Sequence, residues 1–361
     1  MNNKLTYILT ISIFFFHLCF VYTVSAEQGK KPQGNSDRWT VDIWKKEKAC
    51  NGTTLFTDTT DMHNPRIVEV DMEGRVVWEY RLPDNLKPYY RGIDVERLSN
   101  GNTLFVCALR GVYEVNKEGD IIWSYKTSKI SHDADRLPNG NTLYVFGMED
   151  KITDAQVTEV DKYGHVVWKW SVSKHLDKFT YNPDHLVGGF THTCAVQRLS
   201  NGNTLICLRN FNCLAEVTKQ GDVIRIIGKG IIYYPHDPEI LDSGDILVIS
   251  QYPLLKNYAS QPTPDESVFF YPVAQINSKT GEITWSFDPP NWKQENLTCD
   301  ADRLPNGNTL ILTPLQIIEV TPKEEIVWRL KVNAKKLGLN EVINGASRLH
   351  YLQKIQRITR N

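Results

Sequence analysis

The chain has 361 residues, of which 41 % are hydrophobic, and its 41 basic side chains nearly balance its 42 acidic ones. This composition excludes a disordered chain and a protein with many membrane spans. The near-neutral charge argues against a basic surface for a polyanion, so nucleic acid is not expected as a partner. The aromatic content of 11 % favours a β-rich fold.

Residues 1–26 are predicted to be a secretory signal peptide. Lys4 precedes an apolar run at 5–24, and Val24-Ser25-Ala26 offers small side chains for cleavage before Glu27. The chain is therefore expected to be exported, to a periplasm or to the extracellular space. Because the run is long for a cleaved signal, an uncleaved anchor stays open, and membrane contact is expected only in that case. Residues 27–46 form a lead-in segment.

Six repeated units follow. Residues 133–143 and 300–310 both read DADRLPNGNTL, with looser copies at 94–104, 195–205 and 237–247 and a half copy at 51–55. Each unit continues with a second pair of β-patterned runs, as in IVEVDMEGRVVWEY. Asn-Gly between two runs predicts a type I′ hairpin. Four short runs per unit predict an all-β, six-bladed β-propeller of four-stranded antiparallel blades over residues 47–355, with a tail at 356–361.

The first unit lacks the run that precedes its Asn-Gly turn. Residues 344–349 (NGASRL), after the sixth unit, resemble the missing run. We expect the C-terminal strand to complete the first blade, since this closes the ring without an open edge.

Residues that recur in most units are interpreted as structural. Asp94, Asp133, Asp237 and Asp300 share one position in their units and are predicted to accept backbone N–H groups. The aromatic residues that close most units are predicted to pack between blades; they are Trp78, Trp123, Trp168, Trp285 and Trp328.

Histidines do not recur in this way. His132 and His236 take the same position in the third and fifth units, where other units have Ile, Cys or Asn, and His192 stands two residues earlier in the fourth. These positions lie just before the innermost strand of each blade, so the three side chains are expected to converge at the mouth of the central channel. Arg209 is a fourth candidate, although Arg110 stands near the corresponding place in the second unit. A structural role, in which a histidine bonds neighbouring turns, stays open for each.

No metal site is predicted, because the cysteines form no C-x-x-C pair. Which cysteines could pair as disulfides is left open.

Three runs carry a family resemblance: SHDADRLPNGNTL, FTHTCAVQRLSNGNTLICLRN and PHDPEILDSGDIL. They resemble the bacterial arylsulfate sulfotransferase (ASST) family, whose members are periplasmic six-bladed propellers. The resemblance implies transfer of a sulfuryl group from a phenolic sulfate ester to a phenol acceptor, without a nucleotide or other cofactor. It implies that His236 is the nucleophile, that His192 and Arg209 are the family's paired His and Arg, and that His132 is the remaining channel histidine. Cys194 departs from the family's usual Asn, and the oligomeric state stays open.

The chemistry fits these residue types. Neutral imidazole at His236 suits attack on a sulfuryl group already surrounded by negative oxygens. Arg209 and His132 are expected to bind those oxygens, and His192 to exchange the phenol proton. Tyr233, Tyr234 and Phe270 are candidates for holding the aryl ring. The insertion at 251–272 is interpreted as a surface loop by default, with a lid as the alternative.

Two alternatives stay open. One is a non-catalytic exported propeller that binds protein or glycan. The other is a quinoprotein dehydrogenase, which would need more blades, usually eight, and a calcium-binding acidic cluster.

Overall fold

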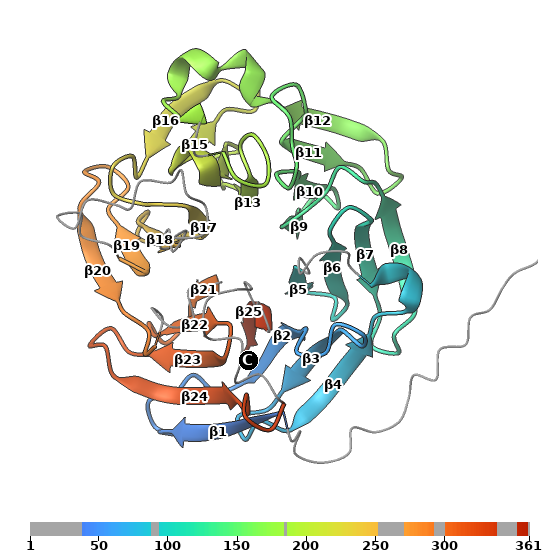
Figure 1. The fold of residues 1–361 in the computed structure, drawn as a ribbon, viewed down its shortest axis with the longest axis vertical. Coiled ribbons are helices and arrows are strands. Elements are labelled where there is room, and N and C mark those ends of the chain that lie inside the picture. Colours follow the sequence, from blue (N-terminus) through green and yellow to red (C-terminus); the bar gives the residue numbers. More distant parts are fainter. Residues whose placement is uncertain are drawn as a thin grey trace, which may run out of the picture.

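The computed structural model describes residues 38–87, 94–183, 186–251, 271–291, 300–337 and 352–359. Six antiparallel sheets stand around one axis, with their innermost strands facing the centre, as Figure 1 shows. The prediction of an all-β, six-bladed propeller is confirmed. Within these residues, no helix has the length and apolar character needed to cross a membrane. The predicted signal segment, Phe270 and most of the insertion at 251–272 lie outside the described residues.

The strand bounds follow one pattern from blade to blade. The first three sheets run β25 (Leu352–Ile358), β2 (Thr53–Asp58), β3 (Arg66–Val70), β4 (Val76–Arg81); β5 (Val95–Arg97), β6 (Thr103–Cys107), β7 (Gly111–Val115), β8 (Ile121–Lys126); and β9 (Ala134–Arg136), β10 (Thr142–Val145), β11 (Val157–Val160), β12 (Val166–Trp170). The next two run β13 (Thr193–Arg198), β14 (Thr204–Leu208), β15 (Cys213–Val217), β16 (Val223–Ile227); and β17 (Pro235–Ile240), β18 (Ile246–Ser250), β19 (Val273–Ile276), β20 (Ile283–Phe287).

The sixth sheet has an extra strand. It runs β21 (Asp300–Arg303), β22 (Thr309–Thr313), β23 (Gln316–Val320), β24 (Ile326–Val332) and β1 (Trp39–Trp44). Short 3₁₀ turns complete the described elements: η1 (Asp84–Leu86), η2 (Val172–Lys174), η3 (Leu176–Lys178) and η5 (Arg209–Phe211).

The Asn-Gly hairpins differ from the predicted type I′ turn. Gly101 adopts φ +86°, whereas Asn100 keeps a negative φ. Gly101 N–H donates to the Leu98 carbonyl, and Leu98 N–H donates to the Asn102 carbonyl. The turn is therefore a three-residue loop with one left-handed glycine, and the type I′ prediction is wrong, because that turn needs two residues at positive φ. The same bonds recur at Gly140, Gly202 and Gly307.

The C-terminal strand completes the first blade, as predicted, but the predicted segment is wrong. β25 pairs with β2 over Leu352–Ile358, and residues 344–349 lie outside the described part of the chain. In this register Arg357 lies opposite Thr54, as Arg97 lies opposite Thr103 in the second blade. Lys354 then takes the position that Asp94 has in the second unit. Because a lysine replaces the repeated aspartate, β25 is hard to recognise as a copy of the repeat from its sequence.

Two repeated contacts join neighbouring blades, and both confirm the predicted structural roles. Carboxylates on the innermost strands accept N–H groups of the next blade: Asp94 from Ala134, Asp133 from Val196, Asp237 from Ala301 and Asp300 from Ile355. The tryptophans face arginines of the next blade, with Trp78 under Arg97, Trp123 under Arg136, Trp168 under Arg198, Trp285 under Arg303 and Trp328 under Arg357. Cation–π contact and the buried strand faces therefore hold the ring together.

Candidate functional site at the channel mouth

Three imidazoles from consecutive blades meet at one end of the channel. The ring centroids of His132 and His192 lie 4.9 Å apart, those of His132 and His236 6.1 Å, and those of His192 and His236 6.5 Å. His132 and His192 stand just before β9 and β13, and His236 lies at the start of β17. Because every innermost strand runs in the same direction, these positions share one end of the ring, as the sequence predicts.

The backbone around these histidines takes an unusual conformation. His192 has φ +48°, and Tyr234 and Asp237 on either side of His236 both have φ +45°. The strand register also shifts between Thr193 and Ala195 and between His236 and Glu239. A left-handed φ at a non-glycine residue costs about 1 kcal/mol or more, so the surrounding contacts must hold these side chains in place.

The tautomer of His192 is set by its neighbour. Its Nδ1 lies 2.7 Å from the Val187 carbonyl oxygen. A carbonyl only accepts, so Nδ1 carries the hydrogen and Nε2 of the neutral ring presents a lone pair. His192 is therefore oriented to accept a proton through Nε2.

His132 has the opposite arrangement. Its Nδ1 lies 2.9 Å from Ser131 Oγ, and that oxygen already accepts the N–H groups of Gly147 (2.9 Å) and Met148 (3.3 Å). The Ser131 hydroxyl hydrogen then points to Nδ1, which leaves the hydrogen of the neutral ring on Nε2. His132 therefore presents an N–H donor where His192 presents an acceptor.

The loop that carries His192 is built on the buried carboxylate of Asp150. Its Oδ1 accepts the N–H groups of Thr191 and His192, both at 3.2 Å, and its Oδ2 accepts the Thr191 hydroxyl at 2.8 Å and the Gln156 amide at 3.0 Å. Burial raises the pKa of Asp150, and the hydrogen bonds from Thr191 oppose that rise. Only glycine fits at residue 189 in this loop, where an added Cβ would lie 2.1 Å from the Gly147 carbonyl oxygen.

Asp150→Ala is expected to destabilise the fold by about 1–3 kcal/mol, because it leaves buried N–H groups without an acceptor. It is also expected to lower any activity that uses His192, since the loop loses its support. Urea denaturation and a rate assay measure the two effects. Asp161→Ala is the control, because Asp161 caps an exposed turn between β11 and β12; an equal loss of activity in both variants would contradict the role given to Asp150.

Arg209 is fixed beside the same loop. It follows β14, is 5 % exposed, and its guanidinium lies 4.6 Å from the centroid of the Tyr234 ring. Nη1 donates to Asn210 Oδ1 at 3.2 Å, and Nε donates to Gln251 Oε1 at 3.4 Å. The Asn210 amide in turn donates to the Gly189 carbonyl at 2.8 Å. These contacts fix the orientation of the guanidinium, a group whose planar fork suits the binding of an anion.

Of the aromatic candidates, Tyr234 lies beside Arg209. One face of the buried Tyr234 ring is taken by the guanidinium, so this side chain supports Arg209. Tyr233 is half-buried, and its N–H donates to Ser250 Oγ at 3.4 Å. The region of Phe270 falls beyond the described residues.

Carboxylates from several innermost strands gather around Lys354 on β25. Lys354 Nζ lies 2.5 Å from Asp237 and 3.9–4.0 Å from Asp94 and Asp300. Burial acts to raise the pKa of Asp237, but the Lys354 ammonium and the hydrogen bonds from Asp300, Lys354 and the Ala301 N–H together outweigh it, and the pKa is lowered. Burial and the Asp237 charge raise the pKa of Asp300 well above its usual value.

Three of the carboxylates near Lys354 have the spacing of metal ligands. One oxygen each of Asp237, Asp300 and Asp302 lies within 4.8 Å of the others. Burial raises the pKa of Asp302 to about 8, which Lys354 partly opposes. Lys354 already supplies positive charge beside this group, so an acidic cluster alone does not define a metal site here.

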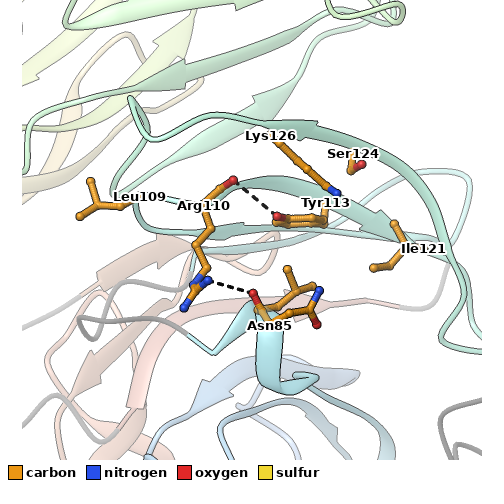
Figure 2. A pocket seen from close by; sticks show the side chains of 8 residues that line it. Asn85, Leu109, Arg110, Tyr113, Ile121, Ser124 and Lys126 are labelled. Carbon is orange, nitrogen blue, oxygen red and sulfur yellow. Dashed lines mark hydrogen bonds between the residues drawn. The ribbon is translucent and has the colours of Figure 1, made fainter. Parts of the chain in front are cut away.

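Another cleft, of about 440 Å³, lies on the outer part of the second blade, and Figure 2 shows its lining. Arg110 crosses from the end of β6 to donate to the Asn85 carbonyl at 3.0 Å, and Tyr113 and Lys126 form its opposite wall. None of the predicted site residues lines it.

Sequence reasoning missed Asp150 and Lys354. Asp150 lies in a loop that is not part of the repeat, and it accepts the N–H group of His192, which is 42 residues further along the chain. A register that aligned Arg357 with Arg97 would have found Lys354, because it occupies an aspartate position of the repeat.

The fold and the site together define a six-bladed propeller that gathers unrepeated histidines at one end of its channel. Residues 40–189 match the model of the Arylsulfotransferase (ASST) family, so the resemblance predicted from the sequence is confirmed over this part of the chain. The match supports an aryl sulfotransferase at the level of the family. It includes His132 and ends before His192, Arg209 and His236.

No curated protein sequence matches the chain. Among solved structures, a protein of unknown function from Bacteroides caccae has a TM-score of 0.53 at 16 % identity, covering 80 % of this chain and 97 % of that one. A streptogramin B lyase has a TM-score of 0.49 at 12 % identity, covering 81 % and 87 % of the two chains. A virginiamycin B lyase from Staphylococcus aureus has a TM-score of 0.47 at 12 % identity, covering 80 % and 87 %. At 16 % identity the Bacteroides caccae structure shares the fold alone.

Proposed function

We propose that this protein is an exported aryl sulfotransferase that moves a sulfuryl group from a phenolic sulfate ester to a phenol through a sulfohistidine on His236. The observation that carries the proposal is the meeting of three imidazoles with ring centroids 4.9–6.5 Å apart. The hydrogen-bond partner of His132 leaves its Nε2 as a donor, and that of His192 leaves its Nε2 as an acceptor. The six blades disfavour a quinoprotein dehydrogenase, because that class would need more blades, usually eight.

In the first step, a neutral His236 nitrogen attacks the sulfur of the ester. The N–S bond forms as the ester S–O bond breaks, and the phenolate leaves with the electron pair of that bond. A protonated His192 gives its Nε2 proton to the leaving phenolate. In the second step neutral His192 takes the proton of the incoming phenol, whose oxygen attacks the sulfohistidine and releases His236.

The sulfuryl oxygens need fixed donors while sulfur is transferred. His132 supplies Nε2–H, and Arg209 supplies a charged guanidinium held by Tyr234, Asn210 and Gln251. Donors that are already oriented stabilise the transition state without reorganising.

Arg209→Ala is expected to lower kcat for sulfuryl transfer by about 10²–10³-fold, because it removes one such donor. Steady-state rates with 4-methylumbelliferyl sulfate and phenol measure the loss. Arg110→Ala, on the separate outer cleft, is the control and is expected to keep the wild-type rate. A rate unchanged in Arg209→Ala would remove Arg209 from the mechanism.

The test of the function is transfer itself. Purified protein with 4-methylumbelliferyl sulfate and phenol should release 4-methylumbelliferone and form phenyl sulfate, and omission of phenol should leave a sulfuryl group on the protein. Peptide mass spectrometry of the protein quenched without acceptor should find that group on His236. Absence of phenyl sulfate with a range of phenols would overturn the proposal in favour of a non-catalytic propeller.

A further inference from the structure

Two buried cysteines of the fourth blade lie directly behind the strand that carries His236. Cys194 on β13 and Cys207 on β14 place their sulfur atoms 3.3 Å apart. Each sulfur is also 3.2 Å from the carbonyl oxygen of Pro235, the residue before His236. Within the described residues, no other two cysteines have a sulfur–sulfur contact of this kind.

The strand geometry explains why these sulfurs meet. Thr193 pairs with Leu208 and Ala195 pairs with Cys207, so Cys194 lies in the irregular step between two ladder positions. That step turns its side chain toward Cys207 on the adjacent strand. A disulfide needs a sulfur–sulfur distance of about 2.05 Å, so the sulfurs must approach by little more than about 1 Å.

We propose that Cys194 and Cys207 form a reversible disulfide that sets the position of His236. An external disulfide, such as oxidised glutathione, is reduced to two thiols, while the two protein thiols lose their hydrogens and form one S–S bond. The effect on catalysis rests on the proposed function, whereas the formation of the bond does not.

The link to His236 runs through the Pro235 carbonyl. As thiols, the cysteines donate weak S–H hydrogen bonds to that oxygen. A disulfide has no S–H group, so the carbonyl loses both donors at once. Pro235 and His236 then shift relative to His132 and His192, and the residues on either side of them, Tyr234 and Asp237, already have φ +45°.

The burial of the two thiols determines when the disulfide forms. Cys194 is 4 % exposed and Cys207 is fully buried, so an oxidant does not reach them in the closed blade. Burial also raises the pKa of Cys207 well above its usual value, which suppresses the reactive thiolate. The redox state is therefore set during folding or during opening of the fourth blade.

The test is refolding in reduced and oxidised glutathione, followed by alkylation of free thiols and peptide mass spectrometry. The oxidised sample should contain a peptide in which Cys194 is linked to Cys207, and dithiothreitol should remove the link. Cys213→Ala, which deletes another buried thiol of the same blade, should keep the link, and Cys207→Ala should lose it. Alkylated Cys194 and Cys207 in the oxidised sample, or links only to other cysteines, would overturn the proposal.

The coupling to His236 has two readouts. The imidazole resonances of His236 should differ between the reduced and oxidised proteins, and this holds whether or not the protein transfers sulfuryl groups. Transfer should fall several-fold on oxidation, recover on reduction, and be insensitive to oxidant in Cys207→Ala. A link that changes neither the resonances nor the rate would overturn the control of His236.

Discussion

His236→Ala should lower kcat for sulfuryl transfer by at least about 10³-fold, because the variant has no nucleophile to divide the reaction into two steps. KM for the donor should change little, since His132 and Arg209 still bind the sulfuryl oxygens. Rates with 4-methylumbelliferyl sulfate and phenol measure both constants. The variant should also fail to form the covalent adduct when phenol is omitted.

His165→Ala is the matched control, because His165 is an exposed histidine bound only locally to Asp161. It should retain the wild-type rate and adduct. Added imidazole should partly restore transfer in His236→Ala by occupying the space of the lost ring. If His236→Ala transfers as fast as the wild type, or if the adduct forms on His132 or His192 in the wild type, the assignment of the nucleophile fails.

The repeats account for how much of the fold was predictable. A unit such as DADRLPNGNTL contains its own strand pattern and turn, so its five full or looser copies and one half copy predict six blades from local information. Two predictions made from the repeat sequence were wrong. Asn100-Gly101 reads as a type I′ turn, but the Leu98–Asn102 pair adds a residue to the loop. Residues 344–349 resemble an inner strand, whereas the strand that pairs with β2 begins at Leu352.

The histidines of the site could be predicted because they stand at positions where the repeat has other residues. His132, His192 and His236 stand at positions where the blade does not need histidine, and the topology places those positions at one end of the ring. Their supports follow no such pattern. Asp150 reaches His192 through a loop between strands, and Lys354 reaches Asp237 across 117 residues. Contacts of this kind depend on the closed ring, which no local pattern describes.

The closing strand carries the largest expected effect on stability, at Arg357. Its guanidinium lies 4.8 Å from the centroid of the Trp328 ring and 3.3 Å from the Glu319 carboxylate, and it donates to the Cys50 carbonyl. Both charged side chains are fully buried. These contacts tie the C-terminal strand of the first blade to the last blade, so they form only when the ring closes.

Arg357→Ala is expected to lower the free energy of unfolding by about 3–5 kcal/mol, because it leaves the Glu319 charge buried without its partner. Arg97→Ala is the matched control, since Arg97 has the same place in the second blade, with Glu69 at 2.7 Å and Trp78 at 4.6 Å. That pair is partly exposed, and its blades are joined by continuous chain, so the control should lose less. Urea denaturation measures both. A loss below about 1 kcal/mol in Arg357→Ala, or one no larger than in the control, would show that closure does not depend on this buried pair.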